Sequence, residues 1–361
     1  MIERSGAGGA GGGGGGDALP DLTDRQATVL RAIVSGYVGE AAPVGSRSLS
    51  HVLPIPLSAA SIRNTMGELA ELGLITKPHR SAGRVPTDAG LRAFVARVAP
   101  RALDDFERRD LAGRVDEIDP EALMKSASRQ LSERTRQLGF LTAPRGSTLV
   151  LRHVSLVRVS TTKVLAVLVT DTGAAIRRVL DDEESGGQPE LDRLAAALNE
   201  RLAGRTLAQV RDALACEVAA LRTHAEGLLE RALRLGWRAL CETPDADEPG
   251  DLVIATRLAL LDQPEFHDPE RVRQLFGALE TKESLLAILR QLIEAKNVTV
   301  VFGEELASPE LRRLALVAAP YGAADAPLGV VGVIGPRRMD YPRVVALVDY
   351  VSALVSERLL S

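Results

Sequence analysis

Apolar residues near the start of the chain recur at intervals of three and four, which is the spacing of one helix face. The first such run covers residues 30–38 and follows Thr23, a suitable N-cap residue. We expect a short second helix that opens after Gly45 and is ended by Pro54. A third helix is predicted for residues 58–72. The chain therefore opens with three helices.

A hairpin and a fourth helix complete this first part. Residues 74–76 have the composition of a strand, residues 77–84 form a polar hairpin tip, and residues 86–98 return to helical spacing. The order helix, helix, helix, hairpin, helix is that of a winged helix-turn-helix. We place this domain at residues 20–98 and expect the glycine-rich residues 1–19 to be disordered.

Strand-like runs flank a helical block in the rest of the chain, after a polar helical stretch at about residues 104–141. The runs are residues 154–159, 164–170, 174–180, 298–302, 314–318 and 329–334. This pattern predicts an α+β multidomain chain, in which a helical insertion interrupts one α/β domain. The expected division is 99–185 for a linker helix and the first part of that domain, 186–294 for the insertion, and 295–361 for its second part.

Apolar residues within the helical block alternate by four and three, as in a coiled-coil-like seam. The seam consists of Leu214, Val218, Leu221, Ala225, Leu228, Ala232, Leu235 and Ala239. Its large members are candidate dimerisation residues, acting directly or as a scaffold. These are Leu214, Val218, Leu221, Leu228 and Leu235. The alternative is that the seam packs within one subunit.

Charge is unevenly distributed along the chain. Residues 20–99 contain nine Lys or Arg and six Asp or Glu, whereas the whole chain has a net charge of −4. A basic first domain on an acidic body indicates a DNA-binding head with a separate regulatory or assembly part. Aromatic residues make up only 3% of the chain, which disfavours stacking on the bases of a single strand.

The third helix of a winged helix lies in the major groove, where side chains near its N-terminus reach base edges. Arg pairs with guanine and Asn with adenine, so Arg63 and Asn64 are the leading candidates for base recognition. Hydroxyl and basic side chains at the start of the second helix suit phosphate, and the hairpin supplies a basic tip. The candidate DNA-binding residues are Ser46, Arg47, Ser48, Ser58, Ala59, Ser61, Arg63, Asn64, Lys77, His79, Arg80, Ser81 and Arg84.

Other kinds of site find little support. The five histidines are dispersed without a metal-ligand spacing, so we expect no metal and no other cofactor. Cys216 and Cys241 match no CxxC spacing, which is typical of a reducing compartment. No segment reaches the ~18 uncharged apolar residues of a membrane span, and the opening stretch lacks the apolar core of a signal peptide. We therefore expect a cytoplasmic protein.

Seven segments along the chain have a distinctive sequence. They are Leu22-Thr-Asp-Arg-Gln, Pro43-Val-Gly-Ser-Arg, Ser58-Ala-Ala-Ser-Ile-Arg-Asn, Glu68-Leu-Ala-Glu-Leu-Gly-Leu-Ile, Pro78-His-Arg-Ser-Ala-Gly-Arg-Val-Pro-Thr-Asp, Leu260-Leu-Asp-Gln-Pro-Glu-Phe and Gly335-Pro-Arg-Arg-Met-Asp-Tyr. These segments resemble the HrcA family of heat-inducible transcription repressors. The resemblance covers the chain from about Leu22 to Leu360.

This resemblance implies a winged-helix domain, a GAF-like α/β domain and a dimerising domain inserted into the latter. It also implies that a homodimer represses chaperone operons of the groEL and dnaK type by binding an inverted repeat, the CIRCE operator. The chaperonin GroEL would assist folding of the repressor, and heat would divert the chaperonin to other clients. The site residues inside the matching motifs are Ser46, Arg47, Ser58, Ser61, Arg63, Asn64, His79, Ser81 and Arg84.

Three other functions compete with this interpretation. A GAF-like fold often holds a small ligand, so a ligand-gated winged-helix regulator is the main alternative. An enzyme is disfavoured because paired acids such as Glu304 and Glu305 have no matching nucleophile and base. A module that binds only proteins is disfavoured by the basic hairpin and by the Arg63–Asn64 pair.

Overall fold

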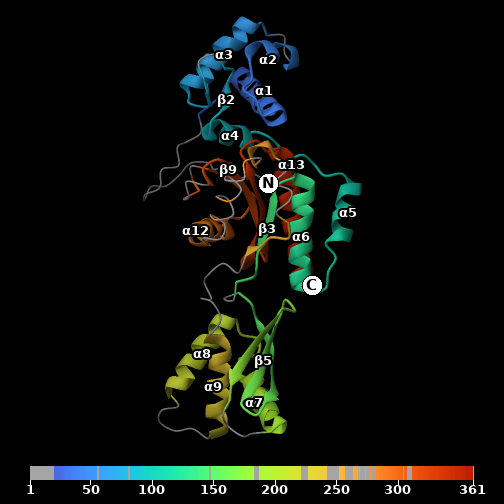
Figure 1. The fold of residues 1–361 in the computed structure, drawn as a ribbon, viewed down its shortest axis with the longest axis vertical. Helices are drawn as coiled ribbons and strands as arrows, with labels where there is room; N and C mark the ends of the chain where they lie inside the picture. Colours follow the sequence, from blue (N-terminus) through green and yellow to red (C-terminus); the bar gives the residue numbers. More distant parts are fainter. Residues whose placement is uncertain are drawn as a thin grey trace.

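The computed structural model has three parts that follow one another along the long axis of the molecule (Figure 1). The N-terminal part lies at one end, a five-stranded sheet with its helices in the middle, and a three-stranded sheet with its helices at the other end. The residues described are 20–54, 57–79, 82–145, 148–182, 187–220, 227–241, 252–256, 263–266, 268, 273, 277, 282–303, 305–306 and 311–360.

The N-terminal part has the predicted order of elements. These are α1 (Asp24–Glu40), α2 (Ser46–Val52), α3 (Ala59–Glu71), β1 (Ile75–Thr76), β2 (Val85–Pro86) and α4 (Asp88–Val95). Thr23 and Gln26 form a capping box at the start of α1, which confirms the predicted N-cap. Gly73 follows α3 with a φ of 71°, a left-handed conformation that glycine adopts without strain.

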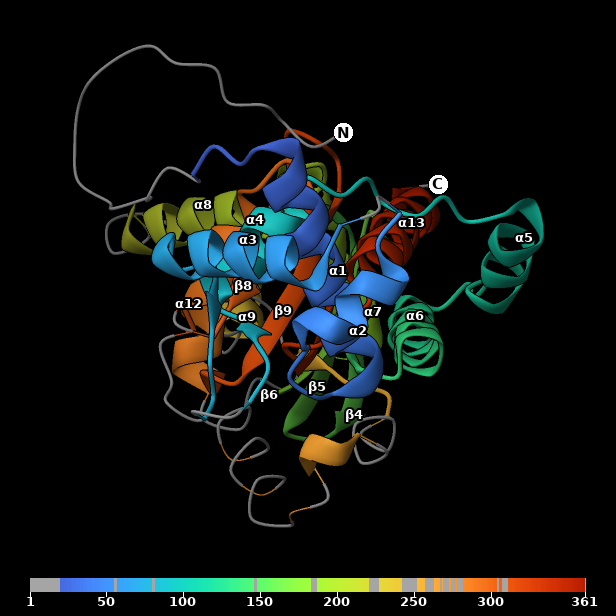
Figure 2. The same ribbon diagram turned by 90° about the horizontal axis from the view of Figure 1, so that it is seen from above.

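One apolar core holds these helices together, because α1 and α3 each bury the stripe that their spacing predicts. The stripes consist of Val29, Leu30, Ile33 and Val34 on α1 and of Ile62, Met66 and Leu69 on α3. β1 and β2 pair antiparallel, with Ile75 opposite Pro86. Seen from above, α4 lies beneath α3, and from the side it lies between the other helices and the central sheet (Figures 1 and 2).

The central sheet has the strand order β7-β3-β10-β9-β8 and is antiparallel throughout. Its strands are β3 (Leu138–Thr142), β7 (Leu252–Val253), β8 (Thr299–Phe302), β9 (Leu314–Gly322) and β10 (Pro327–Pro336). The three runs predicted at residues 298–302, 314–318 and 329–334 are thus confirmed as strands. β3 falls within a stretch for which the sequence predicts helix.

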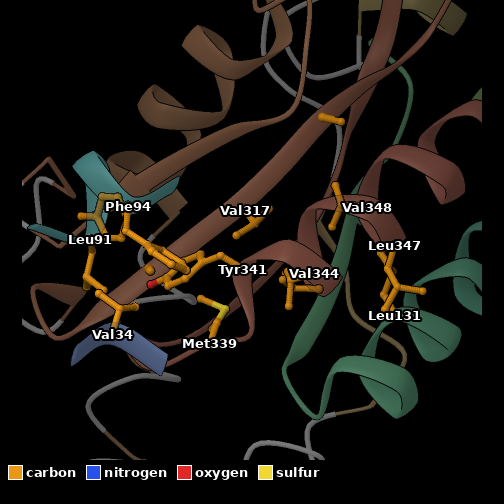
Figure 3. Packing of buried hydrophobic residues seen from close by; sticks show 14 of the residues in the cluster. Val34, Leu91, Phe94, Leu131, Val317, Met339, Tyr341, Val344, Leu347 and Val348 are labelled. Atoms are coloured by element: carbon orange, nitrogen blue, oxygen red, sulfur yellow. The ribbon is translucent and has the colours of Figure 1, made fainter. Parts of the chain in front are cut away.

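Helices cover both faces of this sheet. They are α5 (Asp105–Arg114), α6 (Pro120–Thr135), η1 (Pro264–Phe266), α12 (Lys282–Ile293) and α13 (Tyr341–Leu360). Because strand side chains alternate, Val317 of β9 joins the core of α6 and α13, whereas its neighbour Leu316 joins the core of α12. Figure 3 shows Val317 near Val344 and Val348 of α13. None of the helices described in the structure is both long and apolar enough to cross a membrane.

The third part has its own sheet, with the strand order β4-β5-β6. Its elements are β4 (Leu151–Ser160), β5 (Lys163–Thr170), β6 (Ala175–Asp181), α7 (Gln188–Leu202), α8 (Leu207–Ala220) and α9 (Gly227–Cys241). Alternate residues of the sheet, such as Val154, Ala166 and Leu180, share one apolar core with the helices. The other face of the sheet lies away from that core.

The expected domain limits differ from this arrangement at two places. Residues 154–180 form strands as predicted, but they pack with α7–α9 rather than joining the central sheet. α12 belongs to the core of the central sheet, although the sequence places it in the insertion. The physical reason is the alternation along β4–β6, which gives this sheet a single apolar face, and the helices α7–α9 that follow it directly cover that face.

Candidate nucleic-acid interface

The outward side of α3 carries the two residues predicted to read bases. Ile62 and Met66 point into the core, so Arg63 and Asn64 lie on the solvent side, and both are exposed. Helical spacing dictates this arrangement, because the two polar residues fall between successive turns of the buried stripe. Neither side chain has a hydrogen-bond or ion-pair partner among the described residues, so both are available to a ligand.

One of the candidate DNA-binding residues at the start of α3 also stabilises the helix itself. The Ser58 side chain accepts a hydrogen bond from Ser61 N at 3.1 Å and so caps the helix. Ala59 and Ser61 are half-buried, whereas Ala60, which the sequence analysis did not single out, is exposed. Ser58 is therefore a helix cap first, and its hydroxyl proton remains free to donate.

Residues of α2 flank α3. Arg47 and Ser48 are exposed and Ser46 is half-buried, while Leu49 anchors the helix in the core. Ser50, one turn further on, donates from its hydroxyl to Arg47 O at 2.8 Å. The structure thus presents the predicted basic and hydroxyl side chains of α2 on the surface.

The hairpin is fixed to the segment before α2. Arg84 and Val44 exchange backbone hydrogen bonds, with Val44 N donating to Arg84 O at 2.9 Å and Arg84 N to Val44 O at 2.8 Å. Gly83 lies so close to this segment that a Cβ would come within 2.6 Å of the Val44 carbonyl. Lys77 and His79 are exposed on the hairpin, and Arg84 is half-buried. Arg80 and Ser81 lie outside the described residues.

Charge is available on this surface. In the part of the chain that the structure describes, Arg47, Arg63 and Lys77 form no ion pair. By contrast, Glu68 on the flank of α3 binds Arg25 Nη2 at 3.1 Å and Gln26 Nε2 at 2.9 Å. This contact ties α1 to α3, and no spacing in the sequence indicates it because more than forty residues separate the partners.

The predicted dimerisation residues lie far from this surface, in the third part. Leu214 of α8 is fully buried and Leu235 of α9 is 3% exposed, and both belong to the core shared with β4–β6. The side chains of Val218 and Leu228, and Leu221 as a whole, lie outside the described residues. Where it is described, the seam packs within one subunit, as in the alternative left open by its spacing.

Among the described residues, no group of three or more His, Cys, Asp or Glu side chains is arranged to hold a metal ion. Cys216 is an exposed free thiol on α8. The geometry of the N-terminal part is therefore what the chain offers to a ligand: unpaired basic and amide side chains on a helix, beside a basic hairpin.

Comparisons with known proteins agree with this geometry. A family model described as the HrcA protein C terminal domain matches residues 121–345. The heat-inducible transcription repressor HrcA of Geobacter sulfurreducens is 36% identical over 344 residues, which are 94% of this chain and 99% of the relative. The protein of the same name from Sorangium cellulosum is 36% identical and covers 93% of this chain and 98% of its own.

A solved structure extends the likeness to the fold. It is described as the crystal structure of a hypothetical protein at 2.2 Å resolution, with 25% sequence identity and a TM-score of 0.60. The match covers 94% of this chain and 99% of the other. The resemblance inferred from the motifs is confirmed, and the chain belongs to the HrcA family of heat-inducible transcription repressors.

Proposed function

We propose that this chain is a homodimeric, cytoplasmic repressor of heat-shock chaperone operons of the groEL and dnaK type. It binds the CIRCE inverted repeat through a winged helix-turn-helix formed by residues 20–98. The observation that carries this proposal is the exposed pair Arg63 and Asn64 on α3, opposite a fully buried helix face. Such a helix has one side fixed to the protein and one side free to enter a groove.

Base recognition falls to α3. The Arg63 guanidinium can donate two hydrogen bonds to guanine O6 and N7, and the Asn64 amide can pair with adenine N6 and N7. Ser58 caps this helix and Ser61 lies in its first turn, where they line the approach to the groove. Each good bidentate pair contributes roughly 1–3 kcal/mol of discrimination against the wrong base.

Backbone contacts come from the elements that flank α3. Arg47 and Ser48 of α2 and Lys77 and His79 of the hairpin are exposed donors suited to phosphate oxygens. These contacts carry no sequence information, but they fix the register of α3 and make the affinity fall with salt concentration.

An inverted repeat requires a twofold dimer, and the open face of the β4–β6 sheet is the surface that we assign to it. Val157, Leu165 and Val179 stand opposite one another in the strand register and form an apolar row across this face. Val157 is 42% exposed and Val179 is 56% exposed. Beside the row, Lys163 and Asp181 form an exposed ion pair at 3.0 Å.

A second copy is the occupant that suits this face. An isologous contact places the same patch on both subunits, so the apolar row of one would cover the row of the other. Lys163 and Asp181 add one charge of each sign at the border, which a twofold copy can match without repulsion. The seam on α8 and α9 then acts as the scaffold that supports the sheet from behind.

Control by heat follows from the amount of correctly folded repressor. GroEL assists folding under normal conditions, and heat diverts it to other clients, so active repressor falls and the operons are expressed. The resemblance to the family supports this step, and the exposed apolar row on β4–β6 is a surface that a chaperonin would recognise in an unassembled subunit.

The test is fluorescence anisotropy of the purified protein on a CIRCE duplex and on a scrambled duplex, across a salt series. Tight binding to the CIRCE duplex alone is expected, and Arg63→Ala should reduce that preference at least about tenfold. The matched control is Arg193→Ala, an exposed arginine on α7 in the third part. Equal, weak binding to both duplexes by a folded dimer would favour the ligand-gated regulator instead.

A further inference from the structure

Residues of two sequence motifs that have no part in the proposed DNA contacts, Asp88 and Arg337, meet in the structure. The hairpin motif ends at Asp88, the first residue of α4, and the motif before α13 contains Arg337. Arg337 Nη1 lies 2.9 Å from Asp88 Oδ1. The ion pair joins the N-terminal part to the central part, and its Asp88 end is buried, at 6% exposure, whereas the Arg337 side chain is 31% exposed.

A third motif reaches the same place. Arg338 binds the carboxylate of Glu265 and the side-chain oxygen of Gln263, at 2.9 and 2.8 Å from its Nη2. Gln263 in turn donates to Arg136 O at 3.0 Å. Adjacent arginines thus connect in opposite directions, Arg337 to the N-terminal part and Arg338 to the segment where the chain re-enters the central part.

A second ion pair of opposite polarity lies one helical turn along α4. Arg92, four residues after Asp88, has its Nη2 3.0 Å from Glu305 Oε2 of the central part. The guanidinium also stands 5.9 Å from the centroid of the Phe302 ring. One face of α4 therefore carries an acidic and a basic residue, and each is paired with a residue of opposite charge in the central part.

Apolar side chains fill the space between the two pairs. Figure 3 shows Leu91 and Phe94 of α4 and Val34 of α1 beside Tyr341 and Met339 of the central part. All five belong to one continuous buried cluster. Burial, and then the charge of Asp88, raise the pKa of Tyr341 well above its ordinary value, which agrees with a dry contact.

The two ion pairs determine the orientation of α4 more than they stabilise its contact with the central part. A partly exposed pair such as Arg92–Glu305 contributes little free energy, because solvent screens it. Two pairs of opposite polarity on one helix face are satisfied in only one orientation, however, since a helix turned end for end would place like charges together. Apolar packing holds α4 on the central part, and the two ion pairs determine the orientation of α4 relative to the central sheet.

We propose that Asp88–Arg337 and Arg92–Glu305 are positioning residues that hold the DNA-binding part at one fixed angle on the central part, so that a dimer accepts one spacing between operator half-sites. This inference rests on the proposed function, because half-site spacing has meaning only for a dimer on an inverted repeat. None of the four side chains is placed on DNA.

The first measurement concerns the angle alone and needs no DNA. Spin labels at exposed Ser35 of α1 and Glu357 of α13, with both cysteines replaced and labelled protein diluted into unlabelled protein, report the distance between the two parts. The wild type should give one narrow distance distribution, and Asp88→Asn should broaden it. Asp24→Asn is the matched control, since Asp24 is also the first residue of a helix but is exposed.

The second measurement concerns the operator. Inserting two base pairs between the half-sites rotates one against the other by roughly 70°. Wild-type affinity should fall at least about tenfold on this duplex, whereas the fall for Asp88→Asn or Arg92→Glu should be under about threefold. Affinity for an isolated half-site should stay the same in all variants. The double variant Arg92→Glu with Glu305→Arg should regain the discrimination of the wild type.

The outcomes separate the two proposals. A wild type that does not distinguish the CIRCE duplex from scrambled DNA would overturn the proposed function, and with it the part of the inference that concerns spacing. An unchanged distance distribution in Asp88→Asn would overturn the positioning role even if the operator is bound. Loss of half-site affinity in Arg92→Glu without rescue by the double variant would also count against it.

Discussion

Asn199 of α7 pairs with the backbone of Val154 on β4 as a neighbouring strand would. Val154 N donates to Asn199 Oδ1 at 2.7 Å, and Asn199 Nδ2 donates to Val154 O at 2.8 Å. β4 is an edge strand, and Gln188 bonds Arg158 N and Leu156 O in the same manner. Two amide side chains of one helix thus cover an edge that would otherwise be open to other chains.

Replacing Asn199 by Ala should destabilise the third part of the molecule by about 2 kcal/mol or more, because a backbone donor and an acceptor would lose their partners. Hydrogen exchange at the β4 amides is the measurement, and Val154 should exchange faster. Glu200→Ala, an exposed neighbour on the same helix, should leave this exchange unchanged. Unaltered protection of Val154 in the Asn199 variant would contradict the role of the pairing.

Asn64→Ala should relax specificity at one base position of each half-site rather than weaken binding everywhere. The variant loses about 1–3 kcal/mol of discrimination against a substituted base pair at that position. Competition between operators with single base-pair changes locates the position. A uniform loss over all these operators would assign Asn64 to the DNA backbone instead.

Lys77→Ala should act in the opposite way, since an exposed lysine on the hairpin is suited to phosphate. Affinity should fall for every duplex alike, and the slope of log K against log salt should decrease by about one. Lys125→Ala on α6, whose ion pair with Glu121 is exposed, provides a lysine control outside the N-terminal part. An unchanged salt slope would remove Lys77 from the interface.

Val157→Asp should convert the proposed dimer to monomers, because it places a charge in the apolar row on the open face of β4–β6. Sedimentation velocity measures the change, and circular dichroism checks that the variant is folded. Val52→Asp, at an equally apolar and 74% exposed position on α2, is the control. A Val157 variant that stays dimeric would move the contact to another surface.

Asp182 should contribute stability that depends on pH. Burial alone would raise the pKa of this carboxyl, but Arg231 and Arg158, at 2.7 and 2.8 Å, outweigh burial and hold the pKa below its ordinary value. The folded state therefore binds the proton more weakly than the unfolded state. The stabilisation is complete above the ordinary value of 3.8 and is lost as the pH falls through the lower folded pKa.

The corresponding variant is Asp182→Asn. At pH 7 it should destabilise the third part by about 3 kcal/mol, because buried Arg231 and half-buried Arg158 lose the carboxylate that they share, although Arg231 keeps a second one, that of Glu190. The difference from the wild type should shrink as the pH falls below about 4. Thermal unfolding of both proteins over this pH range is the measurement, and a difference independent of pH would contradict the assignment.

Local patterns were sufficient to predict the N-terminal part. Helical spacing identified α1 and α3, the capping residues Thr23 and Ser58 located their starts, and the exposure of Arg63 followed from the burial of Ile62 beside it. Each of these inferences depends on residues within one or two turns, where the backbone geometry leaves few choices.

The relations between distant segments could not be predicted in this way. Alternation in β4–β6 indicates that one face is buried, but it does not say which helices bury it, and so the sequence assigns these strands to the α/β domain of the central sheet instead of to the third part. β3 is buried along its whole length and lacks the alternation that identifies a strand beside α6. The Asp88–Arg337 contact joins residues far apart in the sequence, and no spacing reports it.

The strand order of the central sheet determines when its strands can pair during translation. β3 leaves the ribosome early, yet its partners β7 and β10 are made only after the whole third part has been translated. The apolar surface of the central part that contacts α4 is completed later still, because Tyr341 and the rest of α13 follow β10 in the sequence. Until β7 and β10 have been made, the fully buried strand β3 has no partner, and until α13 has been made, the N-terminal helices lack the surface on which they pack. Such unpaired and uncovered segments favour aggregation of nascent chains.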